Sequence, residues 1–388
     1  MISADSHIVE PAEVFAGLVD RFGDDAPRLV THEGKPDLMH VPATGLVSLS
    51  PTRVALAGYR AWGPLAVDPG LTDKPDPEDP THPYVEELTQ GGYEALPSGV
   101  ADPVARLDDQ DHDGVEAEVL YPSLFFSVFG LPATEVVVAA FANYNAWLRD
   151  YCASAPDRLI GAALIPLHDP DAGLAALESA LAEGAKTACI PCRAPADRPY
   201  RDEAYAPIWA LAEEAGVPLA MHIGTNAFAP RGQRQGGSRR PSNPIGDYAG
   251  AASVIQATVA ELICQGVAHR HPNLQFVVSE FNAGWVPNWL ERLDQGWMRD
   301  KSAASVDLDR APSGYWATNF KATIEDDRSS VLCRELIGVD NLMWGNDYPH
   351  RDSTWPVSRG VIANVFDGVP ADERDRIIDG TARALYCL

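Results

Sequence analysis

The sequence predicts a (β/α)8 barrel, and three observations support this fold class. Eight short apolar stretches recur along the chain, and Ala- and Leu-rich stretches separate several of them. Several of the apolar stretches are almost continuously hydrophobic, as parallel strands covered on both faces should be. Eight strands that alternate with helices in one chain are typical of a closed parallel barrel. A doubly wound open sheet is the alternative, but no glycine-rich phosphate loop follows the first strand.

The predicted strands are Met1–Ala4, Ala117–Tyr121, Leu159–Ile165, Lys186–Ile190, Val217–Met221, Leu274–Ser279, Phe320–Ile324 and Asn341–Trp344. Amphipathic stretches predict helices over 134–153, 172–183, 204–215 and 251–268. Residues 20–100 are rich in Pro, Gly and Asp, and we expect an insertion with loops and a short hairpin there. Residues 224–249 form a long loop, which in a compact domain is usually functional or disordered. We expect residues 1–388 to be a single barrel domain that carries both features.

Composition and charge restrict the class of protein. The chain has 388 residues, of which 46% are hydrophobic, so it can bury a sizeable core. The net charge of −25 argues against binding to nucleic acid or to anionic membranes, because phosphate binding needs a basic surface. The sequence contains neither an apolar run long enough for a membrane span nor a visible secretory signal. We therefore expect a cytoplasmic protein.

Potential metal ligands follow four of the predicted strands. Asp5 and His7 lie two residues apart at the end of the first strand, so both side chains should project from the same face. His222, Glu280 and Asp347 come directly after three other strands. Because a barrel of this type has its active site at the carboxyl ends of its strands, these residues should meet. The pattern predicts a metal site with an open position for water or substrate.

The residue types narrow the choice of metal. Imidazole and carboxylate without thiolate suit Zn, Mn or Fe, and they disfavour copper or an iron–sulfur cluster. His7, His222 and Asp347, with Asp5 and Glu280 near, can hold one divalent ion. A site with this many oxygen ligands can also hold two metal ions joined by a bridging ligand. A carbamylated Lys at the end of the fourth strand could be such a bridge, but this chain has no Lys there. One or two metals per chain both remain open.

Five segments of the chain resemble motifs of a known family. The matching segments are Asp5–Pro11, Arg106–Gly114, Met221–Gly224, His271–Glu280 and Trp344–His350. They are similar to members of the amidohydrolase superfamily, in particular the amidohydrolase 2 group, which includes aminocarboxymuconate semialdehyde decarboxylase and hydroxybenzoate-type decarboxylases. The resemblance implies a metal-bearing barrel, often a homodimer, that acts on a small-molecule substrate. It maps metal ligation onto His7, His222 and Asp347, with Asp5 as the carboxylate of the first strand.

One departure from the family pattern decides the predicted reaction. Decarboxylases of this group usually carry a His where this chain has Glu280. A carboxylate there would repel a carboxylate substrate unless it is bound to metal or protonated. We therefore predict a metal-dependent hydrolase, in which metal-activated water attacks an amide, ester or thioester. Asp347 would be the general base, and Glu280 a further ligand or proton shuttle. The alternative is non-oxidative decarboxylation of an aromatic or enoic acid, with His350 as the proton donor. A non-catalytic metal-binding protein is a third class.

Other residues are candidates for the substrate pocket. Phe126 and Trp285 follow the second and sixth predicted strands and could form apolar walls, although aromatic residues in such loops as often pack between loops. His168 follows the third strand and could contact the substrate or serve as a turn residue. Arg231 lies in the long loop at 224–249 and could bind an anionic group or face solvent.

Overall fold

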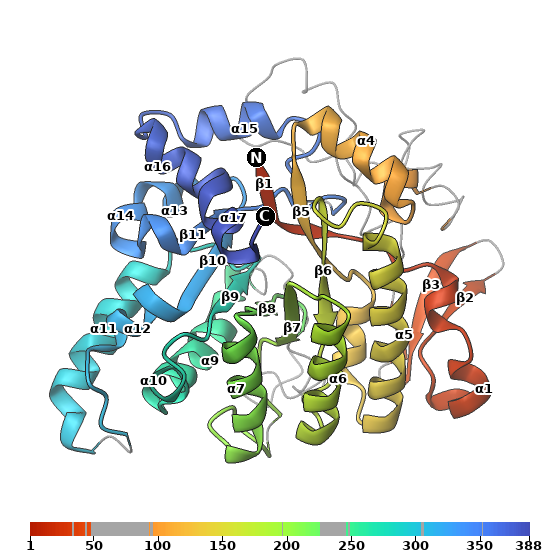
Figure 1. Ribbon diagram of the computed structural model, residues 1–388, viewed down its shortest axis with the longest axis horizontal. Helices are drawn as coiled ribbons and strands as arrows, with labels where there is room; N and C mark the ends of the chain where they lie inside the picture. The colour runs from red at the N-terminus through yellow and green to blue at the C-terminus, as the bar shows by residue number, and fades with distance from the viewer. Residues whose placement is uncertain are drawn as a thin grey trace.

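The computed structural model describes residues 1–32, 35–42, 45–47, 93, 96–195, 197–225, 246, 249–303, 306–350 and 352–388. Eight parallel strands follow one another in a single sheet, with helices around them (Figure 1). They are β1 (Ile2–His7), β5 (Ala117–Tyr121), β6 (Leu159–Leu164), β7 (Thr187–Pro191), β8 (Leu219–His222), β9 (Phe276–Ser279), β10 (Phe320–Ile324) and β11 (Leu342–Trp344). The predicted (β/α)8 barrel is confirmed, and each of the eight strands overlaps its prediction.

The barrel closes just beyond the last strand. The backbone N–H of Asp347 donates to the carbonyl of Asp5 at 2.9 Å, and the N–H of His7 donates to the carbonyl of Tyr348 at 2.6 Å. The chain can approach this closely because residue 345 is a glycine. A Cβ atom added to Gly345 would lie 2.5 Å from the Cβ of Asp5. The first strand and the segment after β11 therefore share one tight backbone contact.

Helices surround the sheet. From residue 103 onward, the α-helices of the described residues are α4 (Pro103–Asp113), α5 (Thr134–Cys152), α6 (Pro170–Ala182), α7 (Ala206–Ala215), α9 (Ala252–Cys264), α10 (Val267–Arg270), α11 (Val286–Asp300), α12 (Pro312–Asn319), α13 (Arg328–Leu332), α14 (Arg334–Ile337), α15 (Ser358–Val365), α16 (Ala371–Asp375) and α17 (Thr381–Tyr386). One prediction needs correction, because the helix expected over 251–268 is two helices. Gly266, at φ +80°, interrupts it in a left-handed conformation that helical residues do not adopt.

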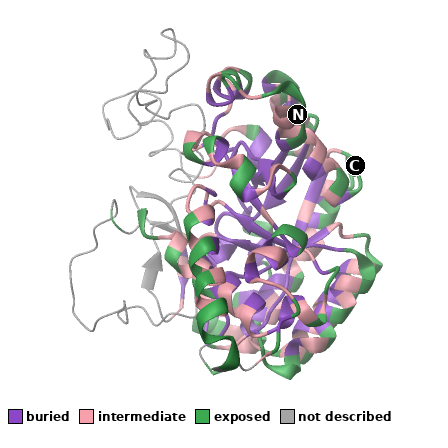
Figure 2. Ribbon diagram, turned by 90° about the vertical axis from the view of Figure 1, so that its left-hand side faces the viewer, coloured by how far each residue is buried: buried purple, intermediate pink, exposed green. Residues whose placement is uncertain are grey.

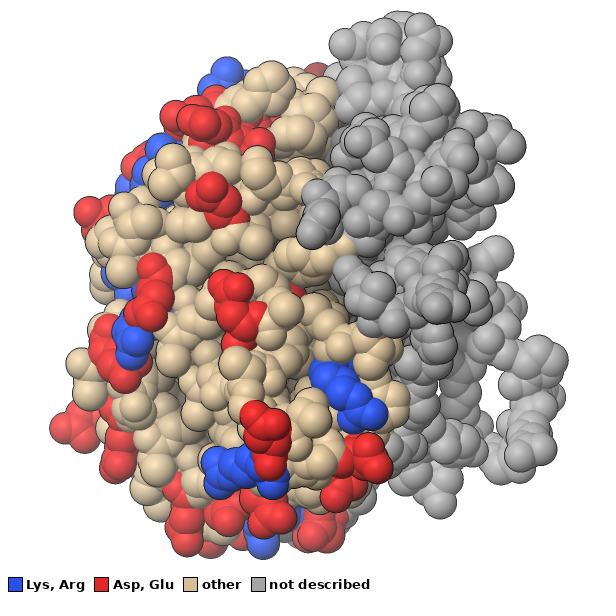
Figure 3. Space-filling view, turned by 90° about the vertical axis from the view of Figure 1, so that its right-hand side faces the viewer, with Lys and Arg blue, Asp and Glu red and all other residues tan. Residues whose placement is uncertain are grey.

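The segment expected as an insertion contains a small antiparallel sheet. Helix α1 (Leu18–Phe22) precedes β2 (Arg28–His32), β3 (Lys35–Val41) and β4 (Gly45–Val47), which pair in that order. The predicted hairpin is present, and residues 48–92 lie outside the described residues. Among the described residues, none of the helices combines the length and apolarity that spanning a membrane would require. Acidic side chains are spread over the face in Figure 3, with Lys and Arg among them.

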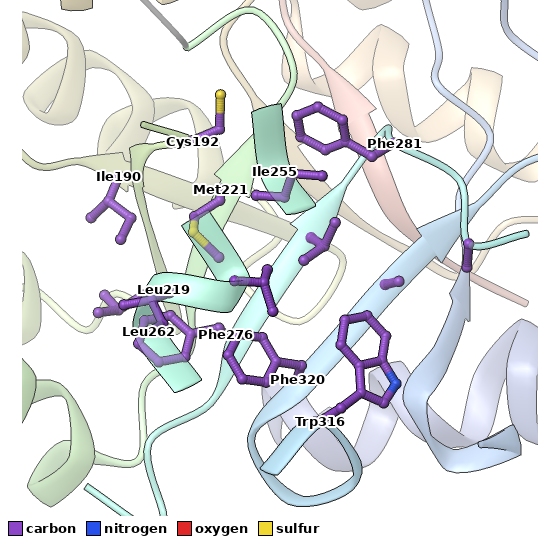
Figure 4. Close-up of a cluster of buried hydrophobic side chains, with 14 of the residues drawn as sticks. Ile190, Cys192, Leu219, Met221, Ile255, Leu262, Phe276, Phe281, Trp316 and Phe320 are labelled. Carbon is purple, nitrogen blue, oxygen red and sulfur yellow. The ribbon is translucent and has the colours of Figure 1, made fainter. Parts of the chain in front are cut away.

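Alternation along β8 directs one of the predicted ligands into the barrel. Leu219 and Met221 belong to the core between sheet and helices, where they lie near Leu262 of α9 (Figure 4). Ala220 belongs instead to the apolar cluster that includes inward-facing residues of β1 and β6. Because side chains alternate between faces along a strand, His222 points to the same side as Ala220. Figure 2 shows the strands of the barrel as the buried interior of the molecule.

A buried carboxyl group organises the turn after β5. Glu10 is fully buried and accepts the backbone N–H groups of Leu124 and Phe125, each at 2.9 Å. These two residues begin the short 3-10 helix η6 (Phe125–Gly130). Burial raises the pKa of Glu10 to about 7, against the lowering effect of the two backbone donors. Glu10 therefore fixes the start of η6, which carries Phe126.

Replacing Gly345 by Ala should destabilise the protein, because the new Cβ would overlap the Cβ and the backbone N and Cα atoms of Asp5. These atoms cannot move aside without moving the first strand. We expect a loss of roughly 1–3 kcal/mol or more in the free energy of unfolding, as for other overpacked sites. Urea unfolding followed by circular dichroism measures it. Gly296→Ala in α11 is the control, because a Cβ there meets no atom within 4 Å. Equal stability of the two variants would contradict the account of barrel closure.

The stability of the protein should carry a pH-dependent contribution from Glu10. The folded-state pKa of about 7 lies above the ordinary 4.5, so folding favours the protonated side chain. This contribution is complete below about pH 4.5 and is lost as the pH rises through about 7. Relative to Glu10→Gln, the wild type should lose roughly 2 kcal/mol between about pH 5.5 and pH 8.5. Urea unfolding of both proteins tests this, and a stability difference that is constant across that range would refute it.

Candidate active site

Five side chains predicted as ligands converge at the carboxyl ends of the strands. Asp5 and His7 come from β1, His222 ends β8, and Glu280 and Asp347 follow β9 and β11. The Nε2 of His222 lies 3.0 Å from Asp5 Oδ1 and 3.4 Å from Glu280 Oε2. The Nε2 of His7 lies 3.2 Å from Asp347 Oδ1 and 3.6 Å from Asp5 Oδ1. The structure thus brings together residues from four strand ends that are up to 342 positions apart in the chain.

Backbone carbonyls fix the orientation of the two central imidazoles. Nδ1 of His7 lies 2.9 Å from the carbonyl oxygen of Pro122, and Nδ1 of His222 lies 2.8 Å from that of Ile223. A carbonyl oxygen can only accept, so Nδ1 carries a hydrogen in each ring and Nε2 is the nitrogen that faces the carboxylates of the cluster. This is the arrangement in which histidines bind metals.

The cluster contains buried polar atoms whose hydrogen-bonding capacity is unmet. His7 Nε2 and both carboxylate oxygens of Asp347 are buried and make no well-formed hydrogen bond to the described residues. Buried polar atoms are normally paired, so these atoms point to a missing partner. The potential ligands form two groups that share His7, and within each group the donor atoms lie within 4.8 Å of one another. One group is His7, Glu280, Asp347 and His350, and the other is Asp5, His7 and His222. The donors are nitrogen and oxygen without thiolate, so they fit a divalent cation.

The turns that carry the carboxylates have unusual backbone conformations. Glu280, Asn282 and Asp347 have φ values of 61°, 52° and 52°, in the left-handed region that few residues other than glycine adopt. Such conformations persist where the surrounding structure imposes them, and they cluster at functional sites. Here they occur at the two turns that bring Glu280 and Asp347 to the histidines.

Burial and mutual repulsion control the ionisation of the cluster. Burial, followed by the charge of His350, lowers the pKa of His7 to about 4, so its imidazole is neutral at pH 7. Burial alone would raise the pKa of Asp347, but the neighbouring His350 and His7 hold it below its usual range. Burial raises the pKa of Glu280 well above its ordinary value, and the carboxylates of Asp347 and Glu325 add to this effect.

His350 and Phe126 complete the immediate surroundings. Nδ1 of His350 lies 3.0 Å from Asp347 Oδ1, and its ring stacks on His7 with centroids 3.7 Å apart. The side chain of His350 is 17% exposed whereas that of Asp347 is 1% exposed. The ring of Phe126 lies 4.5 Å from that of His222 and 5.8 Å from that of His7. Sequence reasoning placed both residues near the site, and the structure brings both to the cluster.

The other predicted pocket residues make different contacts. Nε2 of His168 lies 3.0 Å from the carbonyl of Phe129, so this ring contacts η6. Trp285 has ring contacts with Trp289 and Trp316, and its indole N–H donates to the carbonyls of Phe281 and Asn282. These contacts are those of a packed loop residue, which was the alternative for Trp285. Arg231 lies outside the described residues.

Sequence reasoning missed the residues that support the site. Thr323 donates to Asp5 Oδ2 at 2.7 Å and accepts the backbone N–H of Glu280 at 2.8 Å. Ser123 lies 2.9 Å from His350. Arg106 donates to the backbone carbonyl of His7 at 2.8 Å. Arg106 lies in a matching motif and Ser123 follows a predicted strand, so their positions could have drawn attention, but nothing in the sequence shows their partners.

The chain is similar to known decarboxylases in sequence. A γ-resorcylate decarboxylase from Rhodococcus jostii is 26% identical over 307 residues, which span 72% of this chain and 85% of that protein. A γ-resorcylate decarboxylase from a Rhizobium species is 25% identical over 301 residues, which span 73% of this chain and 86% of that protein.

Solved structures share the fold. An amidohydrolase from Mycobacterium avium subsp. paratuberculosis superposes with a TM-score of 0.79 at 21% identity, over 99% of this chain and 97% of that chain. A 5-carboxyvanillate decarboxylase from Novosphingobium aromaticivorans, complexed with manganese and 4-hydroxy-3-methoxy-5-nitrobenzoic acid, superposes with a TM-score of 0.65 at 20% identity. That superposition covers 100% of this chain and 96% of the decarboxylase.

These comparisons overturn the predicted reaction. The prediction of a hydrolase is wrong, because the curated relatives are decarboxylases, and they favour the alternative instead. The prediction assumed that a charged Glu280 would repel a substrate carboxylate. In the structure, burial and the neighbouring Asp347 and Glu325 raise the pKa of Glu280, which opposes the charged form that the prediction assumed.

The family is established over most of the chain. The sequence model of the amidohydrolase family matches residues 102–388, which include seven of the eight barrel strands and the segments that carry His222, Glu280 and Asp347. With the barrel and the converging histidines and carboxylates described above, this match shows that the chain is an enzyme of the amidohydrolase superfamily and belongs to the amidohydrolase family.

Proposed function

We propose that this protein is a metal-dependent, non-oxidative decarboxylase of an aromatic carboxylic acid that carries a hydroxyl group beside the carboxylate. The observation that carries the proposal is that three curated relatives, which span 72% to 73% of this chain, are all γ-resorcylate decarboxylases. The buried cluster of His7, His222 and Asp347 supports it, because it offers donor atoms for a metal in a site lined by Phe126.

The proposed cofactor is one divalent ion, with manganese as the first choice. His7, His222 and Asp347 would hold it, with Asp5 as a further carboxylate. The two groups of donor atoms share His7, which favours a single centre over two. Manganese is chosen because a structurally similar 5-carboxyvanillate decarboxylase and a dihydroxybenzoic acid decarboxylase bind it. When bound, such an ion supplies a Lewis acid for the carboxylate and the adjacent hydroxyl oxygen of the substrate.

The side chains of this chain would handle the proton that decarboxylation consumes. The bond between ring carbon and carboxylate breaks, CO2 leaves, and the ring carbon receives H⁺. Asp347 Oδ1 and His350 Nδ1 lie 3.0 Å apart and can share this proton. Asp347 is almost fully buried and His350 is partly exposed, so His350 connects the buried carboxyl group to solvent. When protonated, Glu280 would donate a hydrogen bond to the substrate carboxylate instead of repelling it.

The remaining expectations accompany this proposal. Phe126, which packs against His222, would wall the aromatic ring of the substrate. Contacts of His168, Trp285 and Arg231 with the substrate stay predictions. We further propose that the protein works as a homodimer in the cytoplasm. The homodimer rests on the family resemblance, and the cytoplasmic location rests on the charge of the chain.

Decarboxylation can be tested directly. Protein reconstituted with Mn²⁺ should convert 2,6-dihydroxybenzoate or 5-carboxyvanillate to CO2 and the corresponding phenol, with one deuterium on the ring when the solvent is D2O. Chelation should abolish the reaction and added Mn²⁺ should restore it. Asp347→Asn should lower kcat by roughly 100-fold or more, because it removes a proton-handling carboxylate.

Asp309→Asn is the matched control, since Asp309 is an exposed carboxylate whose hydrogen bond is to Tyr315 rather than to the cluster. Its turnover should equal that of the wild type. Failure of both substrates with Mn, Zn and Fe, or turnover that survives chelation, would overturn the proposal.

A further inference from the structure

Ser123 lies between the cluster and the backbone of the first strand. Its Oγ is 2.9 Å from His350 Nε2 and donates to the carbonyl oxygen of Ile8 at 2.7 Å. Ser123 follows β5 and is 5% exposed, and Ile8 follows β1 directly and is fully buried. Two neighbouring strands of the barrel therefore fix this hydroxyl group.

The number of hydrogens on the hydroxyl group decides the direction of both bonds. A serine hydroxyl has one hydrogen and two lone pairs. A carbonyl oxygen can only accept, so the bond to Ile8 uses the hydroxyl hydrogen. Ser123 Oγ must then accept from His350, and Nε2 of His350 carries a hydrogen.

The opposite side of the imidazole faces Asp347. With Nε2 held at Ser123, Nδ1 lies 3.0 Å from Asp347 Oδ1. Stacking on His7, at 3.7 Å between centroids and 25° between planes, restrains the tilt of the ring. Stacking does not distinguish this ring from one turned by 180° about the Cβ–Cγ bond, because the two faces of the ring are alike. The hydrogen bond from Ser123 makes that distinction, since the rotated ring would present carbon atoms to both Ser123 and Asp347.

We propose that Ser123 is a positioning residue, which fixes the ring orientation of His350 so that Nε2 faces Ser123 and Nδ1 faces Asp347. Its catalytic consequence rests on the proposed function, in which Asp347 and His350 share the proton delivered to the substrate. The orientation itself does not depend on that function and can be measured without substrate.

Selective ¹⁵N labelling of histidine tests the orientation. Long-range ¹H–¹⁵N spectra separate protonated from unprotonated ring nitrogens, and His350→Gln identifies the signals of His350. The protein is treated with Zn²⁺, which is diamagnetic. In the wild type, Nε2 of His350 should have the shift of a nitrogen that carries hydrogen. Ser123→Ala should move this signal, and Ser123→Thr, which keeps the hydroxyl group, should restore it.

Turnover with Mn²⁺ gives the second measurement. Ser123→Ala should lower kcat by roughly ten-fold or more with little change in KM, because the ring loses its position rather than the substrate its binding site. Ser123→Thr should recover most of the loss. Ser127→Ala is the matched control, because this nearby hydroxyl group bonds to the carbonyl of Leu124 in the same turn. It should change neither the spectrum nor the rate.

The outcomes separate this inference from the proposed function. An unchanged His350 signal in Ser123→Ala overturns the positioning role, whatever the activity. A changed signal in a protein without decarboxylase activity supports the positioning role and counts against the proposed function. If Ser123→Ala does not fold, Ser123→Cys replaces it, because the thiol keeps the volume but is a weak hydrogen-bonding group. An unchanged signal in that variant overturns the proposal equally.

Discussion

The geometry of the site depends on one buried ion pair beneath it. Arg106 of α4 donates from Nε to Glu118 of β5 at 2.6 Å, and both residues are almost completely buried. The same guanidinium donates to the backbone carbonyl of His7 at 2.8 Å and to that of Tyr348 at 3.4 Å. Its carbon lies 4.4 Å from the centre of the Tyr348 ring. One side chain therefore joins a helix, two strands and the segment after β11.

Burying two charges costs free energy, and hydrogen bonds to the remaining polar atoms of both side chains offset that cost. Glu118 also accepts from Gln110 at 3.0 Å and from the side chain of Asn346 at 3.3 Å. Loss of either charged partner would leave the other uncompensated, at a cost of roughly 3–5 kcal/mol. The pair is therefore best understood as a means of fixing geometry, since apolar residues could stabilise the fold at lower cost.

The cluster takes its shape from this support. Asn346 accepts from Ser3 and Ser6, at 3.0 Å and 2.7 Å, where the pairing of β1 with β5 shifts register. The irregular stretch contains Asp5 and precedes His7, and Asn346 precedes Asp347. Bulges of this kind redirect side chains at active sites. The carboxylates and imidazoles of the cluster are thus attached to backbone that the Arg106 network holds in place, which maintains their close spacing.

The barrel and the residues that form the cluster could be predicted from the sequence, but the chemistry of the cluster could not. Strands buried on both faces, such as Leu342–Trp344, appear as apolar runs, and ligands at strand ends follow from topology. The ionisation of Glu280 depends on burial and on Asp347 and Glu325, which approach it only in the folded chain. The predicted reaction assumed a charged Glu280, and the decarboxylase relatives contradict that reaction. The partners of Ser123, and the backbone carbonyls of His7 and Tyr348 that Arg106 contacts, were inaccessible for the same reason, because these bonds join residues 99 to 242 positions apart.

The central claim is that His7, His222 and Asp347 form one metal centre. The most direct measurement is crystallographic, with protein reconstituted in Mn²⁺ and diffraction recorded above and below the manganese absorption edge. The account predicts one anomalous peak per chain, within bonding distance of Nε2 of both histidines and of a carboxylate oxygen of Asp347. A peak elsewhere, or none at this cluster in protein that binds Mn²⁺ in solution, would contradict it.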